Sequence, residues 1–118
     1  MQNSPLLTLP QTYYPALTQY NWPSTNFLVS PSHFPMIAQI TNDGLLRITY
    51  GEEGSLTREE MLSRQPEKFK QFVPGAPEPS EYEIVNFSPY KIHQRCAEKF
   101  REGRVLLAAD AAHLCNPL

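Results

Sequence analysis

The chain has 118 residues, a formal net charge of -2 and 41% hydrophobic residues, a composition that allows one small packed domain. Without a run of like charges, this balance gives no electrostatic case for nucleic-acid binding. No stretch approaches the roughly 20 apolar residues that cross a bilayer. Only two cysteines are present, Cys96 and Cys115, which indicates free thiols and a cytoplasmic protein.

The first part of the chain lacks a clear hydrophobic period. Residues 1–25 are polar and rich in Pro and Tyr, and they predict a loop or a poorly ordered lead-in. Pro5 and Pro10 also interrupt the apolar residues near the N-terminus, so no signal peptide is predicted.

Two strands joined by a tight turn are predicted next. Asn42-Asp43-Gly44 tolerates positive φ, which is typical of a hairpin turn between strands over 33–41 and 45–50. Alternation places one set of apolar side chains on one face of each strand. These are Phe34, Met36, Ala38 and Ile40 in the first strand, and Leu46, Ile48 and Tyr50 in the second.

Helical segments follow the hairpin. Thr57 and Glu60 have the spacing of a capping box, in which each side chain bonds the backbone N–H of the other residue. Because Pro66 has no N–H, the first helix is predicted to end near Gln65. Pro66 then begins a second short helix whose buried side carries Phe69, Phe72 and Val73.

The last third of the chain predicts extended segments and one buried strand. A strand is expected over 82–87, and a second over 90–97 after Pro89. The apolar run 105–109 has the character of a strand buried on both faces in a parallel sheet, with Asp110 as the N-cap of a following helix. Since no parallel partner is found, we expect its neighbours to belong to residues that this chain lacks.

The strongest local motif surrounds Asp110. A carboxylate at the carboxyl end of a buried strand can accept hydrogen bonds from ligand hydroxyls. The nearby alanines leave room for a ligand, and helix N-terminal amides can bind its anionic groups. The alternative is that Asp110 only caps a helix.

The segment Gly103-Arg104-Val105-Leu106-Leu107-Ala108-Ala109-Asp110-Ala111-Ala112-His113, followed by Pro117, resembles a known motif. It is similar to the second FAD-binding motif of the p-hydroxybenzoate hydroxylase-like flavoprotein monooxygenases, written G-R-V-x-L-x-G-D-A-A-H-x-x-x-P. Ala109 departs from the common Gly. The resemblance implies that Asp110 binds the ribityl hydroxyls of FAD and that Pro117 lies near the isoalloxazine ring.

The resemblance extends upstream, where the sequence is similar to the substrate-domain sheet of fungal members. It implies an α+β fold: an antiparallel substrate-domain sheet with covering helices over 21–102, and a strand-turn-helix over 103–118 that returns to a Rossmann-like FAD domain. Residues 1–20 match nothing and are expected to be an irregular lead-in. Because the sheet borders the aromatic-substrate pocket in that family, His93, Arg95 and Arg47 are candidate substrate contacts; the alternative is a solvated polar face.

The implied activity is hydroxylation of a small aromatic compound with FAD, NAD(P)H and O2, and no catalytic residue is assigned. The chain has no G-x-G-x-x-G pattern, which binds the FAD pyrophosphate in such enzymes. Asn42-Asp43-Gly44 also lacks the Ser and Arg that follow the family's middle D-G motif. We therefore expect a truncated fragment with weak or no FAD binding and no turnover of its own.

Rival interpretations use other residues. His93-x-x-Cys96 and His113-x-Cys115 offer zinc-type ligands, but strand positions three apart point to opposite faces, so no metal site is predicted. Cys115 or Cys96 is a weak candidate nucleophile, and the sequence marks no base partner beyond His113, the neighbour of Cys115. A third interpretation is a non-enzymatic interaction module or degenerate remnant, which binds a partner or itself through exposed strands.

Overall fold

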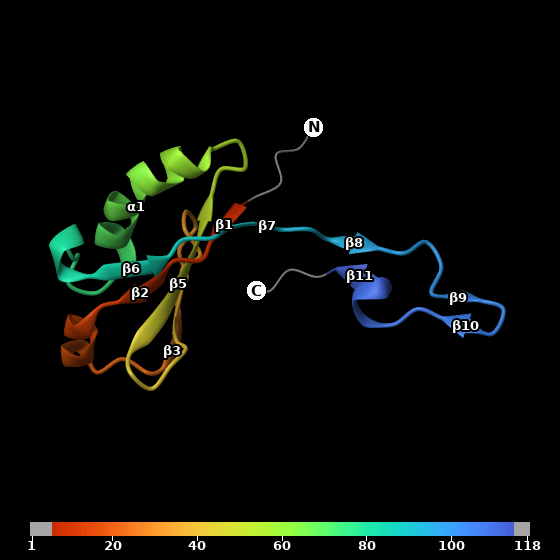
Figure 1. Cartoon of the computed structure of the whole chain (residues 1–118), viewed down its shortest axis with the longest axis horizontal. Helices are drawn as coiled ribbons and strands as arrows, with labels where there is room; N and C mark the ends of the chain where they lie inside the picture. The colour runs from red at the N-terminus through yellow and green to blue at the C-terminus, as the bar shows by residue number, and fades with distance from the viewer. Residues whose placement is uncertain (1–5, 115–118) are drawn as a thin grey trace.

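The computed structural model describes residues 6–114 and has an α+β fold with an antiparallel sheet and one main helix (Figure 1). The seven-stranded sheet has the order β3-β4-β5-β1-β7, with β2 beside β5 and β6 beside β2. Its strands are β1 Leu6–Thr8, β2 Gln11–Tyr13, β3 Thr25–Phe27, β4 Met36–Gln39, β5 Leu45–Glu52, β6 Glu83–Asn86 and β7 Pro89–Lys91. The helical elements of this body are η1 Pro15–Tyr20, α1 Arg58–Phe72 and η2 Pro79–Glu81.

Strand β5 is the centre of the sheet because three strands pair with it. On one side it pairs with β4, and on the other with β1 and β2, which follow each other along its length. The predicted hairpin turn between β4 and β5 is confirmed, and Gly44 in that turn has a φ of 93°. The sheet is therefore built around the longest apolar strand of the chain.

The N-terminal prediction is wrong for residues 6–13, which form β1 and β2 instead of an irregular lead-in. Leu6, Leu7 and Thr8 are all buried. Each strand is only three residues long, too short to show a period. Their structure comes from pairing with β5, which lies far away in the sequence.

The buried face of β4 also differs from the prediction. Ile37 is 1% exposed, whereas Phe34 and Ile40 are exposed. The register pairs Ile37 with Ile48, so these two side chains share the buried face, while Met36 and Ala38 lie on the other. A positive φ of 44° at Phe34 separates it from the strand that begins at Met36, and this breaks the expected alternation.

Helix α1 begins with the predicted capping box. The Thr57 N–H donates to Glu60 Oε2 at 2.7 Å, and the Glu60 N–H donates to Thr57 Oγ1 at 3.3 Å. The predicted end near Gln65 is wrong, because Pro66 lies inside one continuous helix. The buried side runs past the proline through Met61, Gln65 and Phe69, so packing against the sheet outweighs the lost backbone hydrogen bond.

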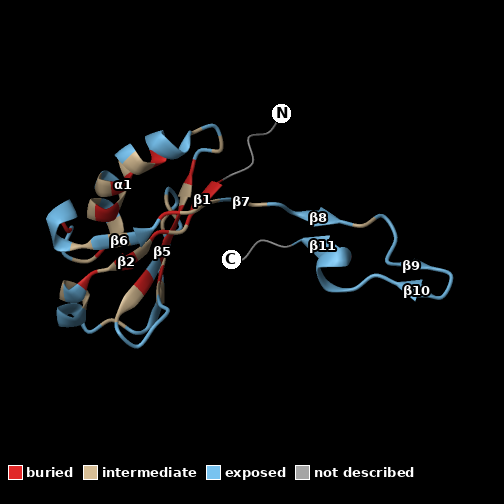
Figure 2. Cartoon of the chain, in the orientation of Figure 1, coloured by how far each residue is buried: buried red, intermediate tan, exposed pale blue. Residues whose placement is uncertain are grey.

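The core lies between α1 and one face of the sheet (Figure 2). Tyr50 and Phe69 are fully buried there, with ring centroids 6.3 Å apart in an edge-on arrangement. The main cluster consists of Tyr14, Ile37, Leu46, Ile48, Tyr50, Phe69 and Val73. Leu6, Met61 and Phe87 form a second cluster.

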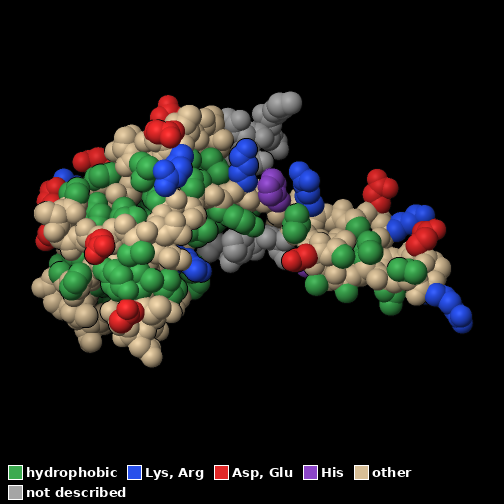
Figure 3. All heavy atoms as spheres, in the orientation of Figure 1, with side chains coloured by type: hydrophobic (Ala, Val, Ile, Leu, Met, Phe, Trp, Pro, Cys, Tyr) green, Lys and Arg blue, Asp and Glu red, His purple; other side chains and the backbone are tan. Residues whose placement is uncertain are grey.

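Beyond β7 the chain leaves the body as an arm that runs to residue 114 (Figure 1). Its elements are β8 Arg95–Cys96, β9 Arg101–Glu102, β10 Val105–Leu106, η3 Ala109–Ala111 and β11 His113–Leu114. Strand β8 pairs with β11, and β9 pairs with β10. Figure 3 shows hydrophobic side chains along the surface of this arm and charged side chains around its tip.

The predicted buried strand over 105–109 is wrong for the described residues. Strand β10 is two residues long, and Val105 and Leu106 are 68% and 71% exposed. Among residues 6–114, β9 is the only strand that pairs with it, and no second layer covers it.

Within the same range, no helix combines the length and apolar character that a membrane crossing needs.

Candidate functional site

Asp110 is the middle residue of η3, a 3-10 helix of one turn, and it is exposed. The prediction that it is a helix N-cap is wrong, since Ala108 occupies the N-cap position and the turn does not continue as an α-helix. The turn is closed by the Ala112 N–H, which donates to the Ala109 carbonyl at 2.8 Å. The carboxylate is thus presented on a short turn between two pieces of strand.

Ala109 has a left-handed backbone, with a φ of 49°. An L-residue with a Cβ adopts this conformation at a cost of about 1–2 kcal/mol, whereas glycine adopts it freely. This is the position at which the resembling motif commonly has Gly. At this position η3 therefore has the left-handed backbone that glycine adopts freely, although the residue in this chain is Ala.

The candidate substrate residues are exposed but do not share one strand. Arg47 is in β5 of the seven-stranded sheet, on the face that it shares with Ala38. Arg95 is in β8 of the arm, and His93 lies in the unpaired segment between β7 and β8. The predicted continuous strand over 90–97 is wrong, because this break separates two strands that belong to different sheets.

The arm brings Cys96 and His113 together, a pairing that sequence reasoning missed. They are direct cross-strand partners in the β8–β11 ladder, where side chains of opposed residues lie on the same face. Cys96 is a free, exposed thiol. Within residues 6–114 no three His, Cys, Asp or Glu side chains gather to hold a metal ion. Cys115 and Pro117 lie outside the described residues.

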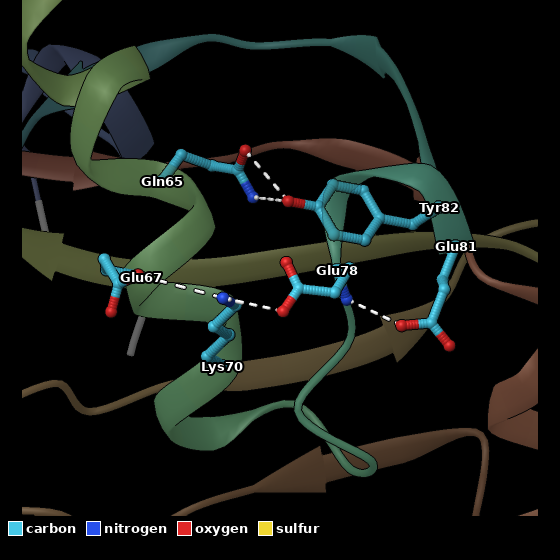
Figure 4. Close-up of polar contacts among 6 residues, drawn as sticks. All are labelled: Gln65, Glu67, Lys70, Glu78, Glu81 and Tyr82. Atoms are coloured by element: carbon cyan, nitrogen blue, oxygen red, sulfur yellow. Dashed lines mark hydrogen bonds and ion pairs between the residues drawn. The ribbon is translucent and has the colours of Figure 1, made fainter.

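A denser polar cluster joins α1 to the segment before β6 and is structural (Figure 4). Lys70 Nζ lies 2.8 Å from Glu78 Oε1, and the Gln65 amide donates to the Tyr82 hydroxyl at 3.0 Å. The Glu78 N–H donates to Glu81 Oε2 at 2.7 Å, which caps η2. The Lys70 and Gln65 contacts hold the helix and the η2 segment together.

A second polar contact joins α1 to β5 through an ion pair of which only the carboxylate is buried. The Glu52 side chain is 1% exposed, and its Oε2 is 3.4 Å from Arg64 Nη2, without the geometry of a hydrogen bond. The neighbouring Tyr50 hydroxyl has no hydrogen-bond partner among the described residues. Burial raises the pKa of Tyr50 above its ordinary value of 10.0, so this hydroxyl stays protonated at neutral pH.

Comparison with known proteins decides the family. Residues 32–118 match the family described as FAD binding domain. The chain belongs to this family. FAD is the cofactor after which the family is described, and the matched range includes the complete arm and Asp110.

Relatives in the family are named as monooxygenases. Para-nitrophenol 4-monooxygenase from Pseudomonas sp. (strain WBC-3) is 44% identical over 99 residues, which are 84% of this chain and 25% of that protein. The 6-hydroxy-3-succinoylpyridine 3-monooxygenase from Pseudomonas putida (strain DSM 28022 / S16) is 36% identical over 116 residues, or 94% of this chain and 29% of that protein.

A solved relative has the same fold over this range. The crystal structure of p-nitrophenol 4-monooxygenase from Pseudomonas putida DLL-E4 matches with a TM-score of 0.84 and 39% identity, covering 97% of this chain and 29% of the solved one. The chain thus spans between a quarter and a third of the length of these relatives. All three are bacterial, so the expected kinship with fungal members has no support.

Proposed function

We propose that this chain is part of an FAD-dependent monooxygenase that hydroxylates a small aromatic compound with NAD(P)H and O2. Membership of the FAD binding domain family and the likeness to two aromatic monooxygenases support the reaction class. The observation that carries the proposal is the exposed Asp110 carboxylate on a turn within the family-matched range. A cytoplasmic location is part of the same proposal.

The exposed Asp110 carboxylate suits the hydroxyl groups of the flavin's sugar-alcohol chain. Asp110 would accept hydrogen bonds from the ribityl hydroxyls, and its alanine neighbours allow close approach to the backbone. Pro117 would lie near the isoalloxazine ring. When bound, FAD supplies the oxygen chemistry, and this chain's residues position it. We assign Asp110 a binding role and no part in proton transfer.

Three exposed side chains are proposed to contact the substrate. Arg47 and Arg95 carry positive charge, and His93 lies two residues before Arg95. Cationic donors suit the negative oxygen of a phenolate or a carboxylate. In this proposal Arg47 acts from the sheet face away from α1, and His93 and Arg95 act from the start of the arm.

The exposed apolar side chains of the arm support the proposed domain division. Residues 21–102 would form the substrate domain together with β1 and β2 of the same sheet, and residues 103–118 would return to a Rossmann-like FAD domain. Val105 and Leu106 are apolar yet largely exposed among the described residues. Apolar groups of this kind stabilise a protein when another layer covers them.

The 118-residue chain alone is expected to bind FAD weakly or not at all and to show no turnover, because it has no pyrophosphate-binding glycine pattern. A fluorescence titration with FAD measures this directly. An affinity in the range of about 1 µM, near -8 kcal/mol, would contradict the expectation.

A chimera tests the binding role of Asp110. We would replace the aligned segment of para-nitrophenol 4-monooxygenase with this chain and measure flavin content and hydroxylation. Asp110→Asn should weaken FAD binding about 10- to 100-fold, because hydrogen bonds to a charged acceptor contribute about 1.5–3 kcal/mol. Glu102→Gln on the same arm is the matched control. If Asp110→Asn retains FAD as firmly as that control, the proposed role is wrong.

A second candidate function is a non-enzymatic module that associates through the arm. Phe100, Val105, Leu106 and Leu107 are exposed there, which favours self-association. Size-exclusion chromatography of the chimera described above, with an absorbance spectrum, separates the two candidates. A yellow chimera supports the flavoprotein, and a colourless chimera that self-associates supports the module.

A further inference from the structure

A cavity of about 650 Å³ lies on the α1 side of the sheet, beyond the end of the helix. Its floor is formed by Ile37 and Leu46 at the end of the β4–β5 hairpin. One wall comes from η1, and the other from the segment around Trp22 that leads into β3. This volume lies within the range of about 300–1,000 Å³ typical of small-molecule sites.

The walls of the cavity are held by specific bonds. The Tyr14 hydroxyl donates to the Pro74 carbonyl at 2.9 Å, which ties the start of η1 to the end of α1. Asn21 ends η1 in a left-handed conformation, and the Asn26 side-chain amide donates to the Pro23 carbonyl at 2.7 Å. The cavity is therefore largely preformed, which reduces the entropy lost on binding a ligand.

The lining combines aromatic surface with uncharged polar groups. The partly exposed Tyr13 and Trp22 provide flat apolar surface, and Asn21, Asn26 and Gln39 provide amide donors and acceptors. Asp43 is the only charged residue among the described residues that line the cavity. Hydrogen bonds from Thr41 and Tyr13 lower the pKa of Asp43, so the carboxylate keeps its negative charge at neutral pH.

This charge pattern selects the ligand class. Because no described residue of the lining carries a positive charge, the Asp43 carboxylate disfavours anionic ligands such as phosphates and ring carboxylates. Aromatic walls favour a flat ring, and side-chain amides favour a ligand that both donates and accepts hydrogen bonds. We propose that the cavity binds a small, uncharged aromatic molecule that carries a hydroxyl or amide substituent.

Trp22 is the single tryptophan of the chain, so its indole N–H gives one resonance in an amide correlation spectrum. The experiment titrates the 15N-labelled 118-residue chain with 4-hydroxybenzamide and, separately, with 4-hydroxybenzoate of the same shape. The uncharged amide should shift the indole resonance to saturation. The anion should bind at least about tenfold more weakly, equivalent to about 1.4 kcal/mol.

Two serine variants locate the response. Ser24 lines the cavity and its side chain is exposed, so Ser24→Phe should fill the space and remove the saturable shift. Ser32 is also exposed but is not part of the lining, so Ser32→Phe should bind like the unaltered chain. The remaining amide resonances of each variant show whether it is folded.

The proposal is overturned if neither compound gives a saturable shift, if both bind equally, or if folded Ser24→Phe binds normally. It does not depend on the proposed flavin site, because the measurement contains no FAD. The candidate substrate contacts Arg47, Arg95 and His93 would instead favour the benzoate. Preference for the amide with loss in Ser24→Phe therefore identifies this cavity, whatever the outcome at Asp110.

Discussion

The Tyr14 hydroxyl bonds the carbonyl of Pro74 across 60 residues of sequence, and Gly75 makes that contact possible. Gly75 has a φ of 84°, and a Cβ at this position would collide with the hydroxyls of Tyr14 and Tyr20. Both tyrosines belong to the η1 region, which covers one end of the main core cluster. A single missing side chain thus allows the N-terminal segment to pack on the end of α1.

Gly75→Ala is expected to destabilise the fold by about 2–4 kcal/mol, through an unfavourable left-handed backbone and displacement of two tyrosine rings. Gly44→Ala is the matched control, since Gly44 has a φ of 93° with open space around its Cβ position. In that control the free energy of unfolding should fall by only about 1–2 kcal/mol, the cost of placing Ala in a left-handed backbone. Urea unfolding measures both, and equal losses would show that the tyrosine contacts have little weight.

Ala109→Gly is expected to stabilise the η3 turn by up to about 1 kcal/mol, because glycine relieves the left-handed strain at a φ of 49°. The readout is hydrogen exchange of the Ala112 amide, whose bond to the Ala109 carbonyl closes the turn. Ala108→Gly is the control, since Ala108 has a φ of -139° and no strain to relieve. Slower exchange in Ala108→Gly than in Ala109→Gly would contradict the prediction.

Arg64→Ala should destabilise the protein by about 1–3 kcal/mol, because it leaves the buried Glu52 carboxylate without its cation. The estimate is below that for a fully buried pair because the Arg64 side chain is 40% exposed to screening solvent. Adding Glu52→Gln should recover part of the loss. A double-mutant cycle in urea measures the coupling, and additive losses would mean that the two groups do not interact.

Local sequence rules predicted the features that depend on neighbouring residues. The Asn42-Asp43-Gly44 turn, the Thr57 capping box and the strand near 82–87 each follow from a few adjacent side chains, and all three are present. Strands β1 and β2 and the buried face of β4 could not be predicted in this way. They depend on the register with β5, which is set by contacts across long stretches of sequence.

Part of the candidate site could also be predicted, because that part depends on adjacent residues. The motif around Asp110 identified the family, because its residues are contiguous. The expected strand and helix on either side of Asp110 were wrong, since apolar composition indicates burial only when a covering layer is present. Trp22 and Tyr14 were overlooked because their cavity exists only where η1 meets the β4–β5 hairpin. The aromatic residues within the polar segment 1–25 were the sequence feature that could have indicated this cavity.

The stability of the fold should fall as the pH drops below about 6.5, the ordinary pKa of histidine. Burial and the nearby Lys68 lower the pKa of His33, and Lys68 Nζ lies 3.2 Å from His33 Nδ1. The folded state binds the His33 proton less tightly than the unfolded state does. The contribution of His33 to the free energy of unfolding is therefore complete at pH values above the unfolded pKa. It is lost progressively as the pH falls toward the lower folded pKa.

His33 sits where the β3–β4 connection packs on α1, with its ring 6.0 Å from that of Phe72. Lys68 opposes the protonated ring and Glu52 partly favours it. His33→Gln should therefore flatten the decline in unfolding free energy between about pH 7 and pH 5. His93→Gln, at an exposed histidine outside the helix-and-sheet body, is the matched control. Urea unfolding across this pH range decides, and an equally steep decline in His33→Gln would assign the pH dependence to other groups.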